Sequence, residues 1–445
     1  MKGFKAVPVL LLTMATVPAQ ASNLVDLYQE TMASDPRLLR AESEEALYQA
    51  RERYQFGGLL PKASVGAQGT RTRRDAATNQ GLDARDYYNG EKYYASVSQP
   101  LYDKPKWEAY RAASKEAGRY SSRYDETRSL IAVDLVDRYT KVLAAEDNYA
   151  FVKAERESAE EQLDQVRARH ERKLAKVTDL LAVEARANML FANEIEALNA
   201  VAIAREGLSE VLGREVTESL DPLNEAVAVA WELGSLEEWV QKSLQDNSAL
   251  KSSRLALEAA AAGVKGAAGQ RHPSLSMSLT AQKSDIGFEN AQVPTTEVYV
   301  AALNLTIPIY SGGQVSAQVS EARSKLRMAE QDYEQIEREL RKKAREAFLN
   351  VKSARERANA ARKAVSSAKK SVEAQEKGFS YGTVTAVDVL AASQTLYEAK
   401  RDFRQAHYDL MLHWVTLQQV AGQFSPDNIT EINGWLDVAQ SAAQE

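Results

Sequence analysis

One stretch of the chain decides its architecture: QVSAQVSEARSKLRMAEQDYEQIERELRKKAREAFLNVKSARERANAARKAVSSAKKSVEAQEK, residues 314–377. Its 64 residues contain neither glycine nor proline, and as a helix they would be about 96 Å long. Apolar side chains recur in alternating steps of three and four, at Val319, Ala322, Leu326, Ala329, Tyr333, Ile336 and Leu340. This heptad spacing predicts a helix that packs lengthwise on other long helices.

The rest of the chain predicts further long helices. From Lys106 to about Glu206, Gly118 is the only helix-breaking residue. Residues 388–420 form another expected helix, which ends at a glycine signal. Shorter helices are expected at about 24–56 and 236–270. A long-helix protein of this kind cannot be a compact globular domain.

Two pairs of short segments alternate apolar and polar side chains, which is the pattern of strands. Residues 275–282 and 297–309 form one pair. Residues 63–68 and 93–98 form the other, across a polar loop of residues 73–90. Each pair predicts a β-hairpin inserted between helices. We expect two apolar rows to face lipid: Leu275, Met277 and Leu279, and Leu303, Leu305 and Ile307.

The two halves of the chain repeat each other. Pro61 matches Pro273 at an offset of 212 residues, and Pro100 matches Pro308 at an offset of 208. The sequence therefore predicts a duplicated architecture. Its parts are a first repeat at 22–213 with a hairpin at 62–101, a connecting segment at 214–235, a second repeat at 236–422 with a hairpin at 274–310, and a C-terminal tail at 423–445.

The N-terminus has the order of an export signal. Lys2 and Lys5 precede an apolar run from Ala6 to Val17, and the small-residue pattern Ala19-Gln20-Ala21 follows. We therefore expect a signal peptide at 1–21. The apolar run is shorter than the ~20 residues that span a bilayer, and no later run is long enough. Any membrane that this chain spans must then be crossed by strands.

Composition excludes several kinds of site. The 445 residues include no cysteine and four histidines, and the net charge is −6. These numbers exclude disulfides and thiolate metal sites and argue against nucleic-acid binding. The glycine-rich segment 263–269 lacks the G-K-[ST] ending of a phosphate loop and precedes a strand. The sequence predicts no enzyme, no cofactor and no metal ion, so energy must come from a partner.

The number of predicted strands indicates whether one chain could close a membrane barrel. Two hairpins supply four strands, whereas eight are the usual minimum for a membrane barrel. Several chains would therefore have to pool their strands, and the long helices would continue the same cylinder. A soluble coiled-coil protein with two small β caps stays open as an alternative at this point.

The second helix–helix turn carries a family resemblance. Residues 379–390, FSYGTVTAVDVL, resemble the hairpin turn of the TolC family of outer-membrane efflux and secretion proteins, as do residues 396–400 and 406–410. The tail segments 420–424 and 431–436 are similar to the branch that serves type I secretion.

This resemblance implies a mainly α fold with membrane β structure: three chains, one shared 12-stranded β-barrel in the outer membrane, and an α-helical tunnel in the periplasm. It implies a channel that exports proteins by type I secretion or expels small toxic compounds. The implied partners are two further copies, outer-membrane lipid, a periplasmic adaptor, and an ABC or proton-driven inner-membrane transporter, with no nucleic acid. A structural periplasmic coiled-coil or adaptor protein is the alternative function.

The resemblance also assigns site residues. It places Asp388 and Asp179 near the pore constriction, although both positions equally suit a carboxylate at a helix start. The implied docking points for partners lie in the two helix turns: Gly378, Gly382, Thr385, Lys173 and Lys176.

Three positions depart from the family pattern. Ala391 stands where the family carries a second acidic residue, and Val384 stands where it often has arginine. Lys173 stands in the first turn where Gly382 stands in the second. The closing interactions of the family are therefore not expected to carry over whole.

Overall fold

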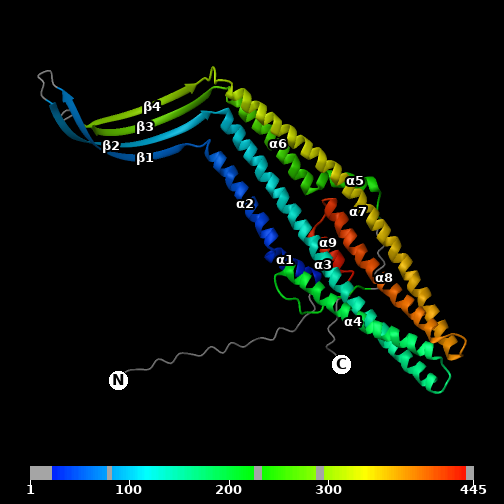
Figure 1. Cartoon of the computed structure of the whole chain (residues 1–445). Coiled ribbons are helices and arrows are strands. Elements are labelled where there is room, and N and C mark those ends of the chain that lie inside the picture. The colour runs from blue at the N-terminus through cyan, green and yellow to red at the C-terminus, as the bar shows by residue number, and fades with distance from the viewer. Residues whose placement is uncertain (1–22, 78–82, 225–232, 287–294, 437–445) are drawn as a thin grey trace, which may run out of the picture.

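The computed structural model describes residues 23–77, 83–224, 233–286 and 295–436, so the expected signal peptide at 1–21 lies outside the described residues. The chain is elongated (Figure 1). A curved sheet forms one end, long helices run away from it, and two helix turns form the opposite end. The elements follow in this order: α1 (Leu24–Ser34), α2 (Pro36–Gly57), β1 (Lys62–Ala77), β2 (Asp83–Tyr102), α3 (Lys104–Glu171), α4 (Val177–Leu212), α5 (Leu236–Asp246), α6 (Ser248–Gly269), β3 (Ser274–Ile286), β4 (Thr296–Thr306), α7 (Gln314–Ser380), α8 (Ala386–Val420) and α9 (Pro426–Asn433).

The stretch without glycine or proline is one helix, α7, of 67 residues. Beyond Leu340 the buried side chains recur in steps of four and three, at Ala344, Ala347, Val351, Ala354 and Ala358, so every second one lies one residue after the position that the predicted spacing gives. Small side chains on this row allow the close lengthwise packing of α7 on α8. Helix α3, with 68 residues, is equally long and passes through Gly118 without a break.

The short helices come in two matching pairs. The expected helix at 24–56 is divided at Asp35 into α1 and α2, and the one at 236–270 is divided at Asn247 into α5 and α6. Asp35 accepts a hydrogen bond from the backbone N–H of Arg37 at 2.7 Å, and Asn247 accepts one from Ala249 at 3.0 Å. Each break is therefore a helix cap, and the two caps stand 212 residues apart, as the sequence repeat does.

The four strands form one antiparallel sheet in the order β1-β2-β3-β4, so the pairing of β2 with β3 joins the two hairpins. One row of the sheet runs through Ser64, Ser96, Thr280 and Val300. The prediction of a loop over residues 73–90 is wrong, because β1 continues to Ala77 and β2 begins at Asp83. Backbone ladder bonds hold a hairpin whatever the polarity of its side chains, so the loss of apolar alternation did not end the strands.

The register places the two expected apolar rows on one face of the sheet. Leu275 pairs with Leu305, and Met277 pairs with Leu303. Leu279 continues the row and pairs with Val97 of β2. The prediction that Ile307 continues this row of the strand is wrong, because β4 ends at Thr306 and leaves Ile307 outside it.

The helices form a layer that changes partners along its length. Near the sheet, α3 packs against α2 and α6, and α6 packs against α7. Toward the turns, α3 packs against α4 and α8, while α7 packs against α8. At mid-length the tail joins the connecting segment through a bridge of Leu223 with Leu436 and a hydrogen bond from Asn224 N to Trp435 O of 3.0 Å. Among the described helices, none is both long and apolar enough to cross a membrane.

Candidate functional site

The two helix turns lie side by side at the end of the molecule opposite the sheet (Figure 1). They pack on each other through a small apolar cluster, in which Val166 of α3, Val183 of α4 and Ala386 of α8 are buried. Phe379 at the end of α7 packs against this cluster. The turns are therefore held together as one structural unit, even though they come from different halves of the chain.

The turn between α7 and α8 is capped at both sides. Gly382 has φ +75°, a left-handed conformation that glycine adopts without strain. Thr383 donates from its backbone N–H and its hydroxyl to the carbonyl of Gly378, at 2.9 and 3.0 Å. A Cβ on Gly378 would stand 3.0 Å from Val384. Both predicted glycines therefore serve the turn itself.

Thr385 and Asp388 form a capping box at the start of α8. The Asp388 carboxylate accepts hydrogen bonds from Thr385 N at 2.8 Å and Thr385 Oγ1 at 2.7 Å, and Asp388 N donates to Thr385 Oγ1 at 3.3 Å. The bonds from the Thr385 hydroxyl and backbone lower the pKa of Asp388. The carboxylate is exposed, so it caps the helix and is also free to meet ions in solution.

The turn between α3 and α4 reaches the same shape with different residues. Lys173 has φ +60° and is the one non-glycine residue with positive φ in the described part of the chain. Lys176 occupies the N-cap position of α4 and offers no side-chain cap. Asp179 is half-buried and accepts a hydrogen bond of 3.5 Å from the Thr178 hydroxyl. The structure therefore brings all seven predicted site residues to this end of the molecule, but only the second turn has a capping box.

Two contacts that the sequence did not predict join the halves near the turns. The guanidinium of Arg169 lies 4.1 Å from the centre of the Phe379 ring and donates to the Phe379 carbonyl at 3.3 Å. Farther up, Glu155 of α3 is 4% exposed and binds Arg186 of α4 at 2.6 Å and Arg401 of α8 at 3.3 Å. The partners lie far apart in the sequence, so no local spacing indicates them.

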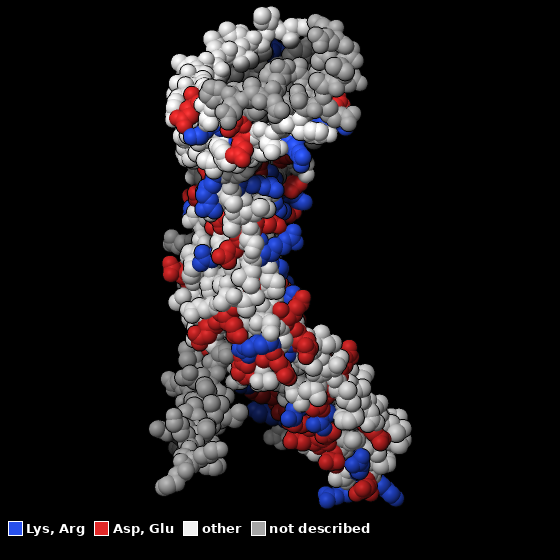
Figure 2. Space-filling model, turned by 90° about the vertical axis from the view of Figure 1, so that its left-hand side faces the viewer, with Lys and Arg blue, Asp and Glu red and all other residues white. Residues whose placement is uncertain are grey.

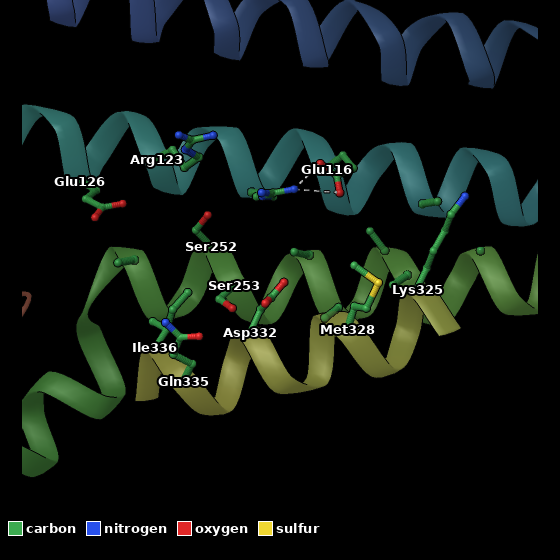
Figure 3. A pocket seen from close by; sticks show the side chains of 18 of the residues that line it. Glu116, Arg123, Glu126, Ser252, Ser253, Lys325, Met328, Asp332, Gln335 and Ile336 are labelled. Atoms are coloured by element: carbon green, nitrogen blue, oxygen red, sulfur yellow. Dashed lines mark hydrogen bonds and ion pairs between the residues drawn. The ribbon is translucent and has the colours of Figure 1, made fainter. Parts of the chain in front are cut away.

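An open groove of about 1170 Å³ lies between α3, α6 and α7. Arg123 and Glu126 of α3, Ser252 and Ser253 of α6, and Asp332 of α7 line it (Figure 3). Helix α6 contributes small side chains to the wall of the groove, which leaves the groove open. The charged side chains around the groove are of both signs. Among the described residues, no group of three or more metal-binding side chains is present. The groove is lined by a mixture of charged, polar and small apolar side chains, with no assembled catalytic group among them.

The comparisons with known proteins agree with this architecture. The sequence pattern of the outer membrane efflux protein family matches residues 27–214 and 239–423. Outer membrane protein TolC of Vibrio cholerae is 29% identical over 94% of this chain and 95% of its own length. Alkaline protease secretion protein AprF of Pseudomonas aeruginosa is 28% identical over 91% of this chain and 85% of its own.

The solved structures support the same fold. The Campylobacter jejuni CmeC outer membrane channel superposes with a TM-score of 0.79 at 18% identity, covering 98% of both chains. The predicted mainly helical fold with a small β part is confirmed, as is an outer-membrane channel for efflux or secretion. The family match decides against a coiled-coil scaffold or adaptor. Because the family pattern covers most of both halves, this chain belongs to the outer membrane efflux protein family.

Proposed function

We propose that three copies of this chain form one channel, with a shared 12-stranded barrel in the outer membrane and a helical tunnel in the periplasm. The free edges of the sheet carry this proposal: β1 and β4 have no outer partner among the described strands. An unpaired strand edge in lipid is costly, and closing a barrel removes it. Four strands are too few to close alone, and three chains bring the number above the usual minimum of about eight.

The helical layer also has a face that suits another copy. Helix α4 exposes a row of large apolar side chains, each more than half exposed: Phe191, Ile195 and Leu198. Apolar rows of this kind mark protein interfaces when they are not covered within one chain. A neighbouring copy would cover the row and continue the helical wall.

The two faces of the sheet suit lipid and water. The face of Leu275, Leu279 and Leu305 would contact lipid, and the Lys283–Glu297 ion pair of 3.0 Å marks the end of its apolar part. The opposite face carries Ser96 and Thr280 among other polar residues and would line the channel. This alternation is the pattern of membrane barrels.

The helix turns would form the inner end of the tunnel. Asp388 and Asp179 would stand near the constriction, and the turns with Gly378, Gly382, Thr385, Lys173 and Lys176 would dock a periplasmic adaptor. An ABC or proton-driven inner-membrane transporter would supply the energy, since the duct itself is passive. The two repeats, 22–213 and 236–422, would each contribute one hairpin and one helix turn.

We infer that the cargo is a protein or a small toxic compound. AprF is named for secretion of alkaline protease, and the Brucella suis relative BepC is named as an efflux protein. A wide water-filled duct makes few specific contacts, so either cargo is compatible with this lining. The chain would act as a conduit and not as an enzyme, and it would use no cofactor.

A disulfide scan tests the shared barrel. The chain contains no cysteine, so two introduced cysteines report on one contact. Ser64 and Val300 lie in the same row but on opposite edges of the sheet, and three strand spacings separate them by about 14 Å. A disulfide needs Cα atoms within about 7 Å, so Ser64→Cys can bond a cysteine on β4 only in another copy.

The scan combines Ser64→Cys with cysteine at Val298, Val300 or Ala302, because barrel closure can shift the register. Non-reducing gels should show covalent dimers and trimers for at least one pair. Ser64→Cys with Ser96→Cys is the control, since those hydroxyls lie 2.8 Å apart in one chain. If the control pair oxidises within one chain while every β4 pair stays monomeric, the shared barrel is wrong.

A further inference from the structure

The turn between α3 and α4 has an exposed surface of unusual composition, which we call the basic tip: Arg172, Lys173, Leu174 and Lys176, together with Tyr381 of the adjacent turn. Leu174 is 74% exposed and Tyr381 is 83% exposed. The three cationic side chains are exposed as well. Lys and Arg side chains gather at this end of the long helices (Figure 2). Exposed large apolar groups next to charged ones are typical of a protein-binding surface.

The positive charge of the basic tip is not balanced locally. Residues 168–179, which correspond to 377–388 of the second turn, contain four basic residues and two acids, Glu171 and Asp179. Arg172, Lys173 and Lys176 form no ion pair within the part of the chain that the structure describes. The second turn is different, because residues 377–388 contain one lysine and one aspartate. The two turns therefore share a shape but differ in charge.

The backbone of the first turn favours glycine and not lysine. Gly382 occupies the equivalent position of the second turn with φ +75°, and Lys173 adopts nearly the same conformation at φ +60°. A side chain at positive φ is strained, and glycine is not. Within the described residues, the Lys173 side chain forms no hydrogen bond or ion pair that would offset this strain. An exposed charged residue at positive φ points to a role in binding.

We propose that the basic tip binds an acidic partner: a protein surface whose carboxylates surround an apolar pocket for Leu174 and Tyr381. This inference rests on the proposed docking function of the turns and specifies the chemistry of the partner. Charge complementarity selects the partner, and the two apolar side chains anchor it. A lipid surface fits less well, since interfacial helices present a continuous apolar face, whereas the tip has separated apolar groups.

Binding of designed hairpin peptides to the full-length protein in detergent tests the proposal. The first probe is an antiparallel helical hairpin whose turn carries glutamates around an apolar pocket, and its twin carries glutamines instead. Because several exposed charge pairs act together, the acidic probe should bind at least about tenfold more tightly than its twin. In 1 M salt, where the Debye length is about 3 Å, this preference should vanish.

Variants assign the preference to the basic tip. Lys173→Glu with Lys176→Glu should abolish the preference for the acidic probe, whereas Lys173→Arg should keep it. Lys369→Glu with Lys370→Glu is the matched control. Both lysines are exposed on α7 before the turn, and the two substitutions change the net charge by the same amount. Lys173→Gly should weaken binding of the acidic probe although it relieves the backbone strain.

The outcomes separate this inference from the docking function. Equal binding of both probes would overturn the acidic partner and leave the turns as a docking site. Loss of the preference in the Lys369/Lys370 control, or no binding of either probe, would overturn the basic tip as the recognition surface. Stronger, charge-dependent binding to phosphatidylglycerol vesicles than to the acidic probe would replace the protein partner with lipid. The disulfide scan tests the shared barrel independently of all three results.

Discussion

Glu155 shows how single residues hold the two halves of this chain together. Its carboxylate is 4% exposed and lies between Arg186 of α4 and Arg401 of α8. Both arginines are partly buried, so neither charge is fully hydrated. A buried carboxylate between two cations is stable only while all three groups are present. The residue therefore links the first helical hairpin to the last helix of the second.

Replacing Glu155 should destabilise the helical part strongly. Glu155→Ala leaves two partly buried guanidiniums without their counter-ion, which costs about 3–5 kcal/mol. Circular dichroism of the full-length protein should show helix loss at a lower temperature. Glu161→Ala is the control on the same helix, since Glu161 is exposed, and it should change stability by less than about 0.5 kcal/mol. Equal melting of the two variants would mean that the Glu155 network is not structural.

Asp388 should bind multivalent cations if three copies place it around one axis. Like charges that are held close repel each other, and a multivalent cation relieves this repulsion. Asp388→Asn removes the charge and keeps an oxygen for the capping box, so assembly should survive. In planar bilayers, the trivalent cation concentration that halves the conductance should rise by about tenfold or more, since ~1.4 kcal/mol is tenfold in affinity. Because Ala391 leaves one acidic ring, the parent channel itself should be blocked only moderately.

If the trivalent cation blocks the parent channel and the Asp388→Asn channel equally, Asp388 acts only as a helix cap. Asp179→Asn is the next variant in that case, because the structure places Asp179 at the same end of the molecule. Trimer assembly measured on the same samples distinguishes a lost cation site from a lost channel.

Residue roles were predictable from the sequence where they depend on neighbours in the chain. Thr385 and Asp388, which form the cap, are three residues apart in the sequence. Gly382 lies in a turn motif that the local sequence defines. The contact of Arg169 with Phe379 spans 210 residues, and that of Arg401 with Glu155 spans 246. One sequence contains no signal for such pairs, because each depends on how two hairpins dock.

At the scale of elements, periodicity predicted the helices better than the strand ends. Helix α7 begins at Gln314, where the stretch without glycine or proline begins. The alternating rows of β3 and β4 also lie on one face, as expected. Strands β1 and β2 extend into the polar segment that was expected to be a loop, because pairing in a two-stranded ribbon does not require an apolar face.

The face assignment makes a prediction for β3. Leu279 lies on the apolar face, where it pairs with Val97 and Ala301, and Ser278 points to the opposite face next to Asn304. An arginine at the membrane midplane on a lipid-facing position costs roughly 2–4 kcal/mol. Leu279→Arg should therefore reduce the amount of assembled protein in outer-membrane fractions far more than Ser278→Arg. The opposite order, or equal assembly, would mean that the faces are reversed or that lipid contacts neither.

At the scale of the whole molecule, most of the predicted fold followed from the duplication of the sequence. Two repeats that each contain a hairpin and a pair of long helices can be recognised from spaced prolines and a helix without breakers. The order β1-β2-β3-β4 could not be derived in the same way, since either hairpin could have paired with another copy first. The structure adds that the hairpins of one chain are neighbours and that, among the described strands, the outer edges of β1 and β4 have no partner.

The most direct test of the account is the mass of the assembled protein. Sedimentation of the purified full-length protein in detergent, corrected for bound detergent, should give three times the mass of one chain. Among the described strands, β1 and β4 each have an edge without a partner, and under the proposal three chains with four strands each would close one barrel. A stable particle with the mass of a single chain would contradict the shared barrel and, with it, the tunnel that the helices are proposed to form.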